Sequence, residues 1–317
     1  MRGRSLVADS RLVVSILGVP VTFETDSTEI LEAIRAAYDP ADIMQSAPAL
    51  RGPRVRVEAA PDVEAAATRE MAVHLPERHR LVVRWGEGEA RADAVRGEAL
   101  ASVGPGAANA AGFRETVLDH LALFLVTSLD RHPLHTAAIE RDGTAVLLVG
   151  SSGLGKSSLT YAAMRAGWRV LADDAVYVQR APHPRLWGVP RRIHLPPEAV
   201  RHFPELEGAP LERRPDGRLK IAVEIGAPSR AGVPWSGAVG LCLLTRSSAR
   251  RRPERVSQPA AAAEMRATLE GGFGRFADSL DECVAALTTE GACWWLPVSV
   301  EPHELVHLVD GLFRAGR

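Results

Sequence analysis

A glycine-rich segment near the middle of the chain has the residue types and the spacing of a phosphate-binding loop. Residues 150–157 read Gly-Ser-Ser-Gly-Leu-Gly-Lys-Ser, which matches the Walker A pattern Gly-x-x-x-x-Gly-Lys-Ser. Its glycines allow several backbone N–H groups to turn toward bound phosphate, through conformations that a Cβ would obstruct. Lys156 would then reach the β and γ phosphates of a nucleotide, and the Ser157 hydroxyl would ligate Mg²⁺. The residues predicted to bind the nucleotide are Gly150, Ser151, Ser152, Gly153, Leu154, Gly155, Lys156, Ser157 and Ser158.

The segments on either side of this loop have the patterns that a phosphate-binding loop requires. Residues 144–149 form a continuous apolar run suited to a buried strand, and residues 158–165 suit a packed helix that ends at Ala166-Gly167. A Gly-Ser turn between a strand and a helix is the simpler alternative, but the order strand, loop, helix is the context that the motif needs. Nearly all basic residues are arginine, and lysine occurs only at Lys156 and Lys220. A lysine in the loop therefore indicates that a compact charge is required there.

Two adjacent acids, Asp173 and Asp174, follow the next predicted strand, residues 168–172. A right-handed strand-helix-strand crossover makes the two strands parallel, so that their carboxyl ends share one edge of the sheet. The acids are therefore expected beside the glycine loop, where Mg²⁺ and the γ phosphate would be. Because neighbouring residues of an extended chain point in opposite directions, we expect one acid to face the substrate hydroxyl and the other the metal. A surface turn or helix cap is the alternative.

A histidine, His135, lies on the predicted strand 132–140, which a tight turn at 141–143 connects to the strand before the glycine loop. It could approach the same sheet edge and orient or tune one of the aspartates. A histidine among apolar neighbours is otherwise more often a core residue. Spacing alone leaves both interpretations open.

The bulk composition is that of an ordinary globular protein. The 317 residues are 46% hydrophobic and 24% charged, with a net charge of −1 and a pI near 6.8, so no global basic field favours nucleic acid or an anionic membrane. Three cysteines without a C-x-x-C pattern argue against disulfides and a zinc site, and fit a reducing cytoplasm. Charged residues within the first residues argue against a signal peptide. The sequence has no apolar run of ~18 residues, so no membrane span is predicted. We therefore expect a cytoplasmic protein, and a homo-oligomer is left open.

Two domains are predicted. Residues 1–112 contain strand-like runs at 12–25, 54–58, 80–85 and 89–95, a capping-box pattern at 26–29 that opens a helix, and a Gly-Pro-Gly breaker at 104–106. We interpret them as an α+β domain that recognises the phosphoacceptor. Residues 113–317 begin with a strong helical stripe at 114–131 and contain the glycine loop. Near the C-terminus a strand with Trp294 and Trp295 is expected to pack under a helix at 302–313, and residues 246–259 are interpreted as a solvated loop.

The order of the histidine, the loop and the paired acids resembles that of the HPr kinase/phosphorylase family and its relatives. The resemblance rests on residues 134–139 (Leu-His-Thr-Ala-Ala-Ile), 146–159 (Val-Leu-Leu-Val-Gly-Ser-Ser-Gly-Leu-Gly-Lys-Ser-Ser-Leu) and 167–174 (Gly-Trp-Arg-Val-Leu-Ala-Asp-Asp). It implies an α/β fold with the P-loop kinase core that this family shares with phosphoenolpyruvate carboxykinase, here preceded by an N-terminal α+β domain. It implies that His135 is the active-site histidine that assists the acids and that Lys156 is the phosphate lysine. Ser157 would be a magnesium ligand, Asp173 the general base and Asp174 the metal-side acid.

The chain departs from the bifunctional enzymes of this family after the acids. Residues 188–196 read Gly-Val-Pro-Arg-Arg-Ile-His-Leu-Pro where those enzymes have a Glu-Ile-Arg-Gly-type signature, which counts against HPr as the substrate and against the phosphorylase reaction. The chain looks more like the HPr-kinase-related proteins encoded beside peptide-maturation genes, including the lasso-peptide kinases, which act on a hydroxyl of a precursor peptide. Cations that could neutralise the transferring phosphoryl group are Arg191, which we favour, and Arg192, Arg213, Arg218 and Lys220.

These features predict an ATP-dependent kinase that uses Mg²⁺ to transfer the γ phosphate to a serine or threonine hydroxyl of a peptide or protein. Asp173 would accept the proton, while Lys156 and an arginine stabilise the charge. Two alternatives stay open. One is a kinase of a small hydroxylated metabolite with the same core, and the other is a nucleotide-binding regulatory module that signals by conformational change without phosphotransfer.

Overall fold

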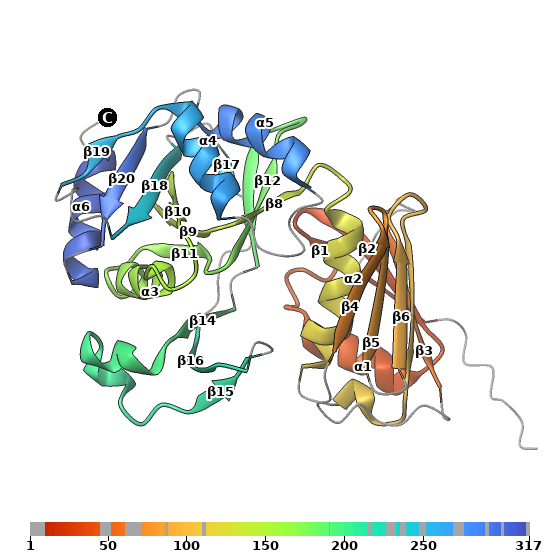
Figure 1. Ribbon diagram of the computed structural model, residues 1–317. Helices are drawn as coiled ribbons and strands as arrows, with labels where there is room; N and C mark the ends of the chain where they lie inside the picture. Colours follow the sequence, from red (N-terminus) through yellow and green to blue (C-terminus); the bar gives the residue numbers. More distant parts are fainter. Residues whose placement is uncertain are drawn as a thin grey trace, which may run out of the picture. The chain divides into compact units, whose positions relative to one another are not determined.

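The computed structural model describes residues 10–44, 52–60, 71–85, 88–109, 112–189, 191–214, 217–225, 233–234, 239–246, 252–268, 276–288, 292–298 and 301–314 (Figure 1). The chain divides into two compact units, Met1–Leu129 and Asp130–Arg317. The sequence predicts a boundary between residues 112 and 113. In the structure the helix that follows this position packs against strands of the first unit and is counted with it.

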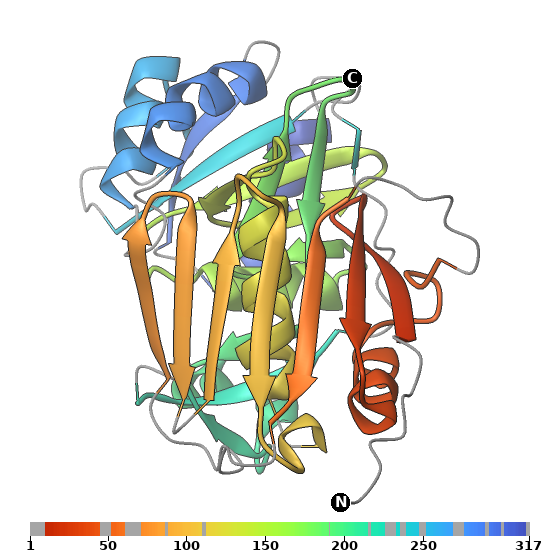
Figure 2. The ribbon, with the colours of Figure 1, turned by 90° about the vertical axis from the view of Figure 1, so that its right-hand side faces the viewer.

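The first unit is built on a seven-stranded sheet with the strand order β1-β2-β3-β7-β6-β5-β4 (Figure 2). Its strands are β1 (Ser10–Ile16), β2 (Val19–Thr25), β3 (Arg54–Ala59), β4 (Ala72–Glu77), β5 (Arg80–Trp85), β6 (Gly88–Asp93) and β7 (Glu98–Val103). Strands β2 and β7 run parallel to β3, and the other neighbouring strands are antiparallel. The strands predicted at 12–25, 54–58, 80–85 and 89–95 lie close to their observed positions, whereas β4 and β7 were not predicted.

Alternating buried and exposed residues give this sheet a covered face. In β2 the side chains of Val21 and Phe23 are fully buried, and their neighbours along the strand are partly exposed. Helix α1 (Thr28–Ala37) packs on β1 and β2 and buries Ile30. The helix begins where the capping pattern predicts, because the Ser27 side chain accepts a hydrogen bond from the Ile30 N–H at 3.3 Å.

A second helical segment packs against the same sheet. The chain forms a π-helical stretch at Arg114–Asp119 and continues as α2 (His120–Val126), which contacts β1, β6 and β7. Leu121 and Leu125 of α2 are buried, in line with the predicted apolar stripe. The helix ends at Val126 rather than at residue 131, because the chain then turns and reaches Asp130 with a left-handed φ of 53°.

The second unit contains a six-stranded central sheet with the order β11-β9-β10-β18-β20-β19. Its strands are β9 (Ala137–Arg141), β10 (Thr144–Val149), β11 (Arg169–Ala172), β18 (Val239–Thr245), β19 (Glu254–Arg255) and β20 (Cys293–Pro297). Strand β18 lies between β10 and β20 and is parallel to both, and helix α3 (Lys156–Arg165) follows β10 and precedes β11. Strand β9 lies between β10 and β11 and is antiparallel to both. The carboxyl ends of β10 and β11 therefore point the same way, as predicted, although the two strands are not hydrogen-bonded neighbours.

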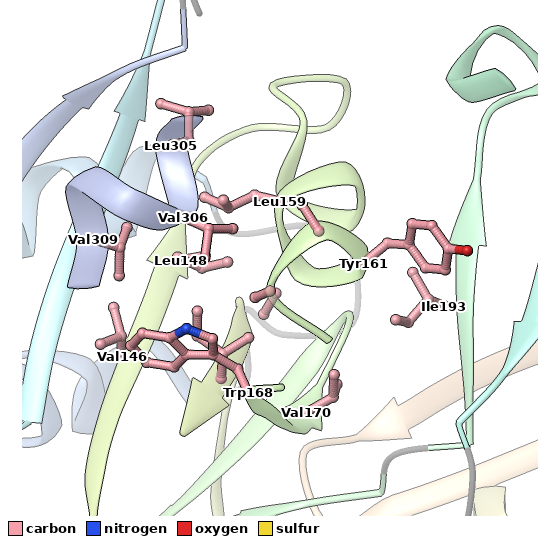
Figure 3. Close-up of a cluster of buried hydrophobic side chains, with 14 of the residues drawn as sticks. Val146, Leu148, Leu159, Tyr161, Trp168, Val170, Ile193, Leu305, Val306 and Val309 are labelled. Atoms are coloured by element: carbon pink, nitrogen blue, oxygen red, sulfur yellow. The ribbon is translucent and has the colours of Figure 1, made fainter. Parts of the chain in front are cut away.

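Both faces of the central sheet are covered, which explains the continuous apolar sequence of β10. The other helices of this unit are α4 (Gln258–Ala267), α5 (Ala277–Thr288) and α6 (Pro302–Arg314). Val146 and Leu148 pack with α3 and α6 (Figure 3), and Leu147 and Val149 pack with α4 and α5. Trp294 of β20 packs against the cluster that contains α6, as predicted, whereas Trp295 packs against the cluster that contains α4 and α5 because neighbouring residues of a strand point to opposite faces. Within the described part of the chain, no helix is both long and apolar enough to cross a membrane.

A four-stranded sheet with the order β17-β13-β12-β8 carries the predicted histidine. Its strands are β8 (His132–His135), β12 (Ala175–Gln179), β13 (Arg185–Gly188) and β17 (Val233–Pro234). The single strand predicted at 132–140 is therefore two strands, β8 and β9, in different sheets. They separate at Thr136, whose buried hydroxyl donates a hydrogen bond to the Leu148 carbonyl at 2.7 Å. The register pairs His135 with Ala175, the residue after Asp174.

The backbones of β13 and β11 come into direct contact at Gly188. A Cβ at this position would lie 1.7 Å from the carbonyl oxygen of Leu171 in β11, so only glycine fits there. This contact holds β13 against the strand that leads to the two acids.

A small three-stranded sheet has the order β14-β16-β15. Its strands are β14 (Arg192–Leu195), β15 (Leu211–Arg213) and β16 (Leu219–Glu224). Ile193, Leu195 and Ile221 are buried and join the core cluster that contains Leu159 and Tyr161 of α3 (Figure 3). Because side chains alternate along a strand, the polar residues of β14 and β16 lie on the opposite face.

Candidate active site

The glycine loop, residues 150–155, connects the end of β10 to the start of α3. Gly153 and Gly155 have left-handed φ values of 83° and 94°, which side-chain-bearing residues rarely adopt. Gly150 is required for a different reason, since a Cβ there would lie 3.0 Å from Leu154 Cδ1 and 3.3 Å from Leu244 Cβ. The predicted strand, loop and helix are therefore present, and the glycines occupy positions that the loop geometry restricts.

Lys156, the first residue of α3, is buried and lies under the loop. Its Nζ donates to the carbonyl oxygens of Gly150 at 2.5 Å and Ser151 at 3.4 Å, and it lies 3.4 Å from His135 Nε2. The two carbonyl oxygens are neutral acceptors, and His135 is neutral when its Nε2 accepts the hydrogen bond. These contacts hold the ammonium group at the base of the glycine loop.

Asp173 is the acid that contacts the start of α3. Its Oδ2 accepts hydrogen bonds from the Ser157 hydroxyl and from the His194 backbone N–H, each at 3.1 Å. Its Oδ1 is buried and has no hydrogen-bond partner in the part of the chain that the structure describes. Burial raises the pKa of Asp173 to about 6, against the lowering effect of the two hydrogen bonds, and the nearby Asp174 raises it further.

Asp174 is exposed and faces a different partner. Its Oδ1 lies 3.4 Å from Nδ1 of the buried His135. The two acids are therefore directed to different groups, which agrees with the expectation for adjacent residues. The structure joins Ser157 to Asp173, however, and not to Asp174, the acid predicted to share the metal with this serine.

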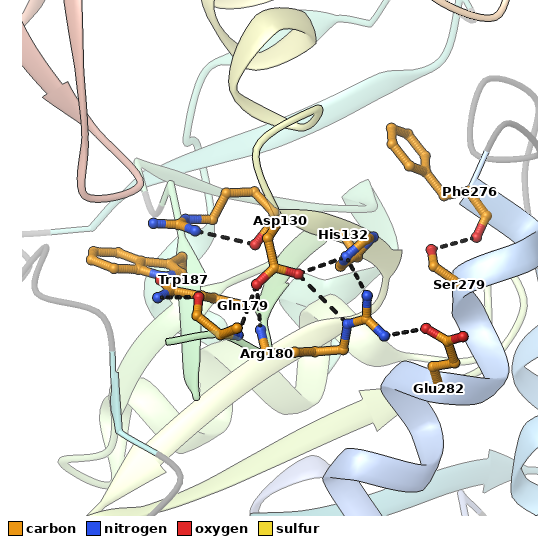
Figure 4. Close-up of polar contacts among 10 residues, drawn as sticks. Asp130, His132, Gln179, Arg180, Trp187, Phe276, Ser279 and Glu282 are labelled. Carbon is orange, nitrogen blue, oxygen red and sulfur yellow. Dashed lines mark hydrogen bonds and ion pairs between the residues drawn. The ribbon is translucent and has the colours of Figure 1, made fainter. Parts of the chain in front are cut away.

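Polar contacts fix the strand that carries His135 (Figure 4). Two residues before β8, Asp130 accepts hydrogen bonds from the backbone N–H groups of Arg180 at 3.0 Å and Ala181 at 2.8 Å, and its carboxylate lies 2.9 Å from His132 Nε2. The Arg180 guanidinium also pairs with Glu282 of α5. These contacts tie β8 to the end of β12 and to α5, so the position of His135 is set by a network beyond its own strand.

Two arginines reach the glycine loop from outside. Arg246 Nη2 donates to the Gly153 carbonyl at 2.7 Å, and Arg218 Nη1 lies 3.5 Å from Ser152 Oγ. Arg246 directly follows β18, whose parallel register with β10 brings the ends of both strands to the same edge. The sequence interpretation placed residue 246 in a solvated loop and did not include it among the site residues. Its position after an apolar strand was the available signal.

His194 and Arg214 are further site residues that were not predicted. The His194 backbone N–H binds Asp173, and its ring Nε2 accepts a hydrogen bond from Arg214 Nη1 at 3.1 Å. Burial lowers the pKa of His194 to about 4, with a further lowering from Arg214, so the ring is neutral near pH 7. His194 lies in the segment 188–196 that replaces the family signature, which was the signal in the sequence.

The other predicted cations lie on or near the small sheet. Arg192 pairs with Glu224 at 2.6 Å and with Glu212 at 3.3 Å, and Arg213 donates to the Gly217 carbonyl. Lys220 lies on β16, and its charge lowers the pKa of Asp173. Arg191 directly precedes β14, where its carbonyl accepts a hydrogen bond from the Ile225 N–H at 2.7 Å. Ser158, the remaining predicted loop-side residue, is half-buried on α3.

The central part of the chain is similar to known kinases. Residues 128–208 match the family described as HPr Serine kinase C-terminal domain. HPr kinase/phosphorylase of Thermoanaerobacter sp. (strain X514) is 36% identical over 75 residues, which cover 24% of this chain and 23% of the relative. HPr kinase/phosphorylase of Streptococcus pyogenes serotype M1 is 35% identical over 89 residues, or 28% of this chain and 27% of the relative.

The family match covers the loop, His135 and both acids. This region is therefore HPr kinase-like. The chain spans only about a quarter of the length of these curated relatives. Arg214, Arg218, Lys220 and Arg246 lie beyond the matched residues.

Proposed function

We propose that this chain, whose central region is HPr kinase-like, is an ATP-dependent kinase that phosphorylates a serine or threonine hydroxyl of a peptide or protein. A ribosomally made precursor peptide of the lasso type is the acceptor class that we favour. The observation that carries the proposal is Asp173, a carboxylate held by Ser157 next to the glycine loop. One of its oxygens is buried and has no hydrogen-bond partner among the described residues, and its pKa is about 6. A general base works best when its pKa lies near the operating pH.

The loop has the features that a nucleotide's phosphates require. Gly153 and Gly155 have positive φ, with open space where a Cβ would be, and Ser151 and Ser152 are exposed. Lys156 supplies a positive charge at the base of the loop. We therefore assign β10, the glycine loop and α3 as a P-loop, and the second unit as a P-loop kinase core.

The oxygen donors near α3 suit magnesium, which prefers hard oxygen ligands. In the described ranges no three His, Cys, Asp or Glu side chains come together as a metal cluster, so Mg²⁺ here would be held through Ser157, a carboxylate of the acid pair and the substrate phosphates. Asp174 is exposed and stays the proposed metal-side acid. When bound, Mg²⁺ would supply charge neutralisation on the nucleotide phosphates.

The side chains can divide the work of phosphoryl transfer. Asp173 accepts the proton of the acceptor hydroxyl at its free Oδ1, while Ser157 and the His194 N–H hold Oδ2 in place. Lys156 binds phosphate oxygens, and His135 positions both this lysine and Asp174. Arg218 and Arg246, which contact the loop, offset the charge of the transferring group. We assign the same role to Arg191. We assign recognition of the acceptor in part to the N-terminal unit.

Replacing the proposed base provides the test. Labelled ATP is incubated with wild type, Asp173→Asn and a panel of serine peptides that includes any short precursor peptide encoded beside the gene. We expect the variant to lose transfer by about 10²–10⁴-fold and to bind ATP with nearly unchanged affinity. Asp142→Asn is the matched control, because Asp142 lies in the β9–β10 turn with a φ of 52° that asparagine tolerates.

Two outcomes would contradict the proposal. Unchanged transfer by Asp173→Asn would remove this residue from the mechanism. Nucleotide binding by the wild type without labelling of any peptide would favour a regulatory module, whereas labelling of metabolites alone would favour a small-molecule kinase.

A further inference from the structure

We propose that Arg214 and Lys220 form an anion subsite beside the acid pair, and that this subsite binds a carboxylate of the acceptor peptide next to its reactive hydroxyl. The inference rests on the proposed kinase function and adds a substrate class, a serine or threonine flanked by acidic residues. It concerns the small sheet formed by β14, β16 and β15 and not the glycine loop.

The subsite is connected to the proposed base by a short chain of contacts. Arg214 Nη1 donates to the ring of His194, and the backbone N–H of the same histidine donates to Asp173. The register of β14 and β16 pairs His194 with Ala222, so Lys220 lies two residues along β16 on the same face. The charge of Lys220 acts on both Asp173 and His194, lowering the pKa of each, which agrees with a position close to both.

Arg214 and Lys220 are half-buried, and among the described residues neither has a carboxylate within ion-pair distance. Arg192, on the same face of the same sheet, pairs with both Glu224 and Glu212. A partly desolvated cation without an ionic partner carries an unfavourable free energy that a ligand carboxylate would offset. The small sheet therefore leaves two positive charges next to the acid that would deprotonate the acceptor.

The position of these cations favours the acceptor over the nucleotide. Arg218 and Arg246 contact the glycine loop, where the nucleotide phosphates are proposed to bind. Arg214 instead contacts the residue that holds Asp173, and Asp173 is where the acceptor hydroxyl must approach. Both Arg214 and Lys220 also lie beyond residues 128–208, so they come from a part of the chain that the family match does not cover.

Binding of defined peptides to the full chain tests this subsite. Fluorescein-labelled peptides with a central serine flanked by Glu, Gln or Lys are titrated with the protein in the presence of Mg²⁺ and a nonhydrolysable ATP analogue, and affinity is read by anisotropy. We expect the Glu peptide to bind at least about 10-fold more tightly than the Gln peptide, as for a charge-assisted contact in a partly buried site. Arg214→Gln and Lys220→Gln should each remove most of this preference, and Arg214→Lys and Lys220→Arg should restore part of it.

Controls separate the subsite from folding and from the nucleotide site. Arg201→Gln changes an exposed arginine at the end of the 3-10 helix Pro197–Arg201, which follows β14, and should keep the preference. Thermal unfolding verifies that the variants are folded. Equal affinities for the Glu and Gln peptides, or a Glu preference that survives both Gln variants, would overturn the subsite. A loss of ATP-analogue affinity in Arg214→Gln equal to the loss for the Glu peptide would assign the two cations to nucleotide phosphates and also overturn it.

The outcome is independent of the test of the kinase itself. Peptide affinity is measured without transfer, so an acidic preference that depends on Arg214 would stand even if no peptide were phosphorylated. Phosphorylation of peptides without such a preference would support the kinase and reject the subsite.

Discussion

The arginines of the seven-stranded sheet in the first unit (the N-terminal sheet) and two arginines of the candidate active site, Arg214 and Arg246, have different kinds of partner. On the sheet, arginines face carboxylates on neighbouring strands, as in the directly opposed ion pairs Arg11–Glu24, Arg54–Glu98 and Arg84–Glu89. At the site, Arg246 donates to a carbonyl oxygen and Arg214 to a neutral histidine ring. In the described part of the chain neither of these two arginines has a carboxylate partner.

The two regions use their positive charges differently. An exposed pair between strands contributes roughly 0.2–1 kcal/mol and leaves the surface near neutral. A cation held by neutral acceptors keeps its charge available for an anion, and a charge-assisted hydrogen bond to that anion is stronger than the bonds it replaces. Substitutions in the two regions should therefore affect different measurements.

The largest expected effect comes from Lys156→Ala at the base of the glycine loop. Loss of the ammonium removes the charge that would bind the phosphates, so we expect kcat/KM for ATP to fall by about 10³-fold, or roughly 4 kcal/mol. Steady-state kinetics with labelled ATP measure the change. Arg84→Ala on the N-terminal sheet is the counterpart and should leave kcat/KM unchanged. Wild-type kinetics of Lys156→Ala would show that the charge of this lysine does not act on the nucleotide.

The second effect concerns stability and Asp173. Its pKa of about 6 in the folded protein lies above the ordinary value of 3.8, so the folded state binds this proton more tightly than the unfolded state does. The free energy of unfolding therefore falls as pH rises from about 4 to about 6, by up to about 3 kcal/mol from this group.

Asp173→Asn should remove this fall and unfold at a higher urea concentration than wild type at pH 7, but not at pH 4. Urea unfolding of both proteins at the two pH values measures it. A variant that is less stable than wild type at pH 7 would show that the hydrogen bonds of the carboxylate outweigh its burial.

A smaller effect is expected for Arg246→Gln. The Gly153 carbonyl loses its charged donor and the loop tip loses one positive charge, so KM for ATP should rise about 10-fold while kcat changes less. Arg252→Gln, an exposed arginine in the same stretch of sequence, serves as the control. Equal KM values for Arg246→Gln and wild type would place Arg246 with the ordinary surface arginines.

The smallest effect is expected for Arg84→Ala itself. Arg84 is well exposed in its ion pair with Glu89. The free energy of unfolding should therefore fall by less than about 1 kcal/mol. The difference should shrink further at 1 M salt, where charges on the surface are screened. A loss above about 2 kcal/mol that persists in high salt would show that this ion pair stabilises the sheet more strongly than an exposed pair does.

Local features of the site could be predicted from the sequence. The glycine loop, the strand before it and the helix after it follow from the spacing of Gly150, Gly155 and Lys156 and from the apolar runs on either side. The direction of β11, and hence the closeness of Asp173 to Ser157, follows from the handedness of the connection. These inferences use residues fewer than about 25 apart, where chain geometry leaves few choices.

Features that depend on distant segments could not be predicted. A tight turn connects β9 to β10 and predicts that the two strands pair, but the sequence does not show that β11 pairs with the other edge of β9. Arg214 and His194 meet through the pairing of β14 and β15 with β16, which no periodicity reveals. The sequence also does not show which acid Ser157 contacts. Ser157 bonds to Asp173 and not to Asp174 because of the side-chain directions at the end of β11.

The contact between Gly188 and Leu171 has a consequence for how the two acids can move. Leu171 precedes Asp173 by two residues, and no side chain lies between the two backbones to take up a displacement. A displacement of β13 toward β11 therefore displaces the backbone that carries the acid pair. Position 188 thus constrains the geometry of the chemistry, although its residue has no side chain with which to touch a substrate.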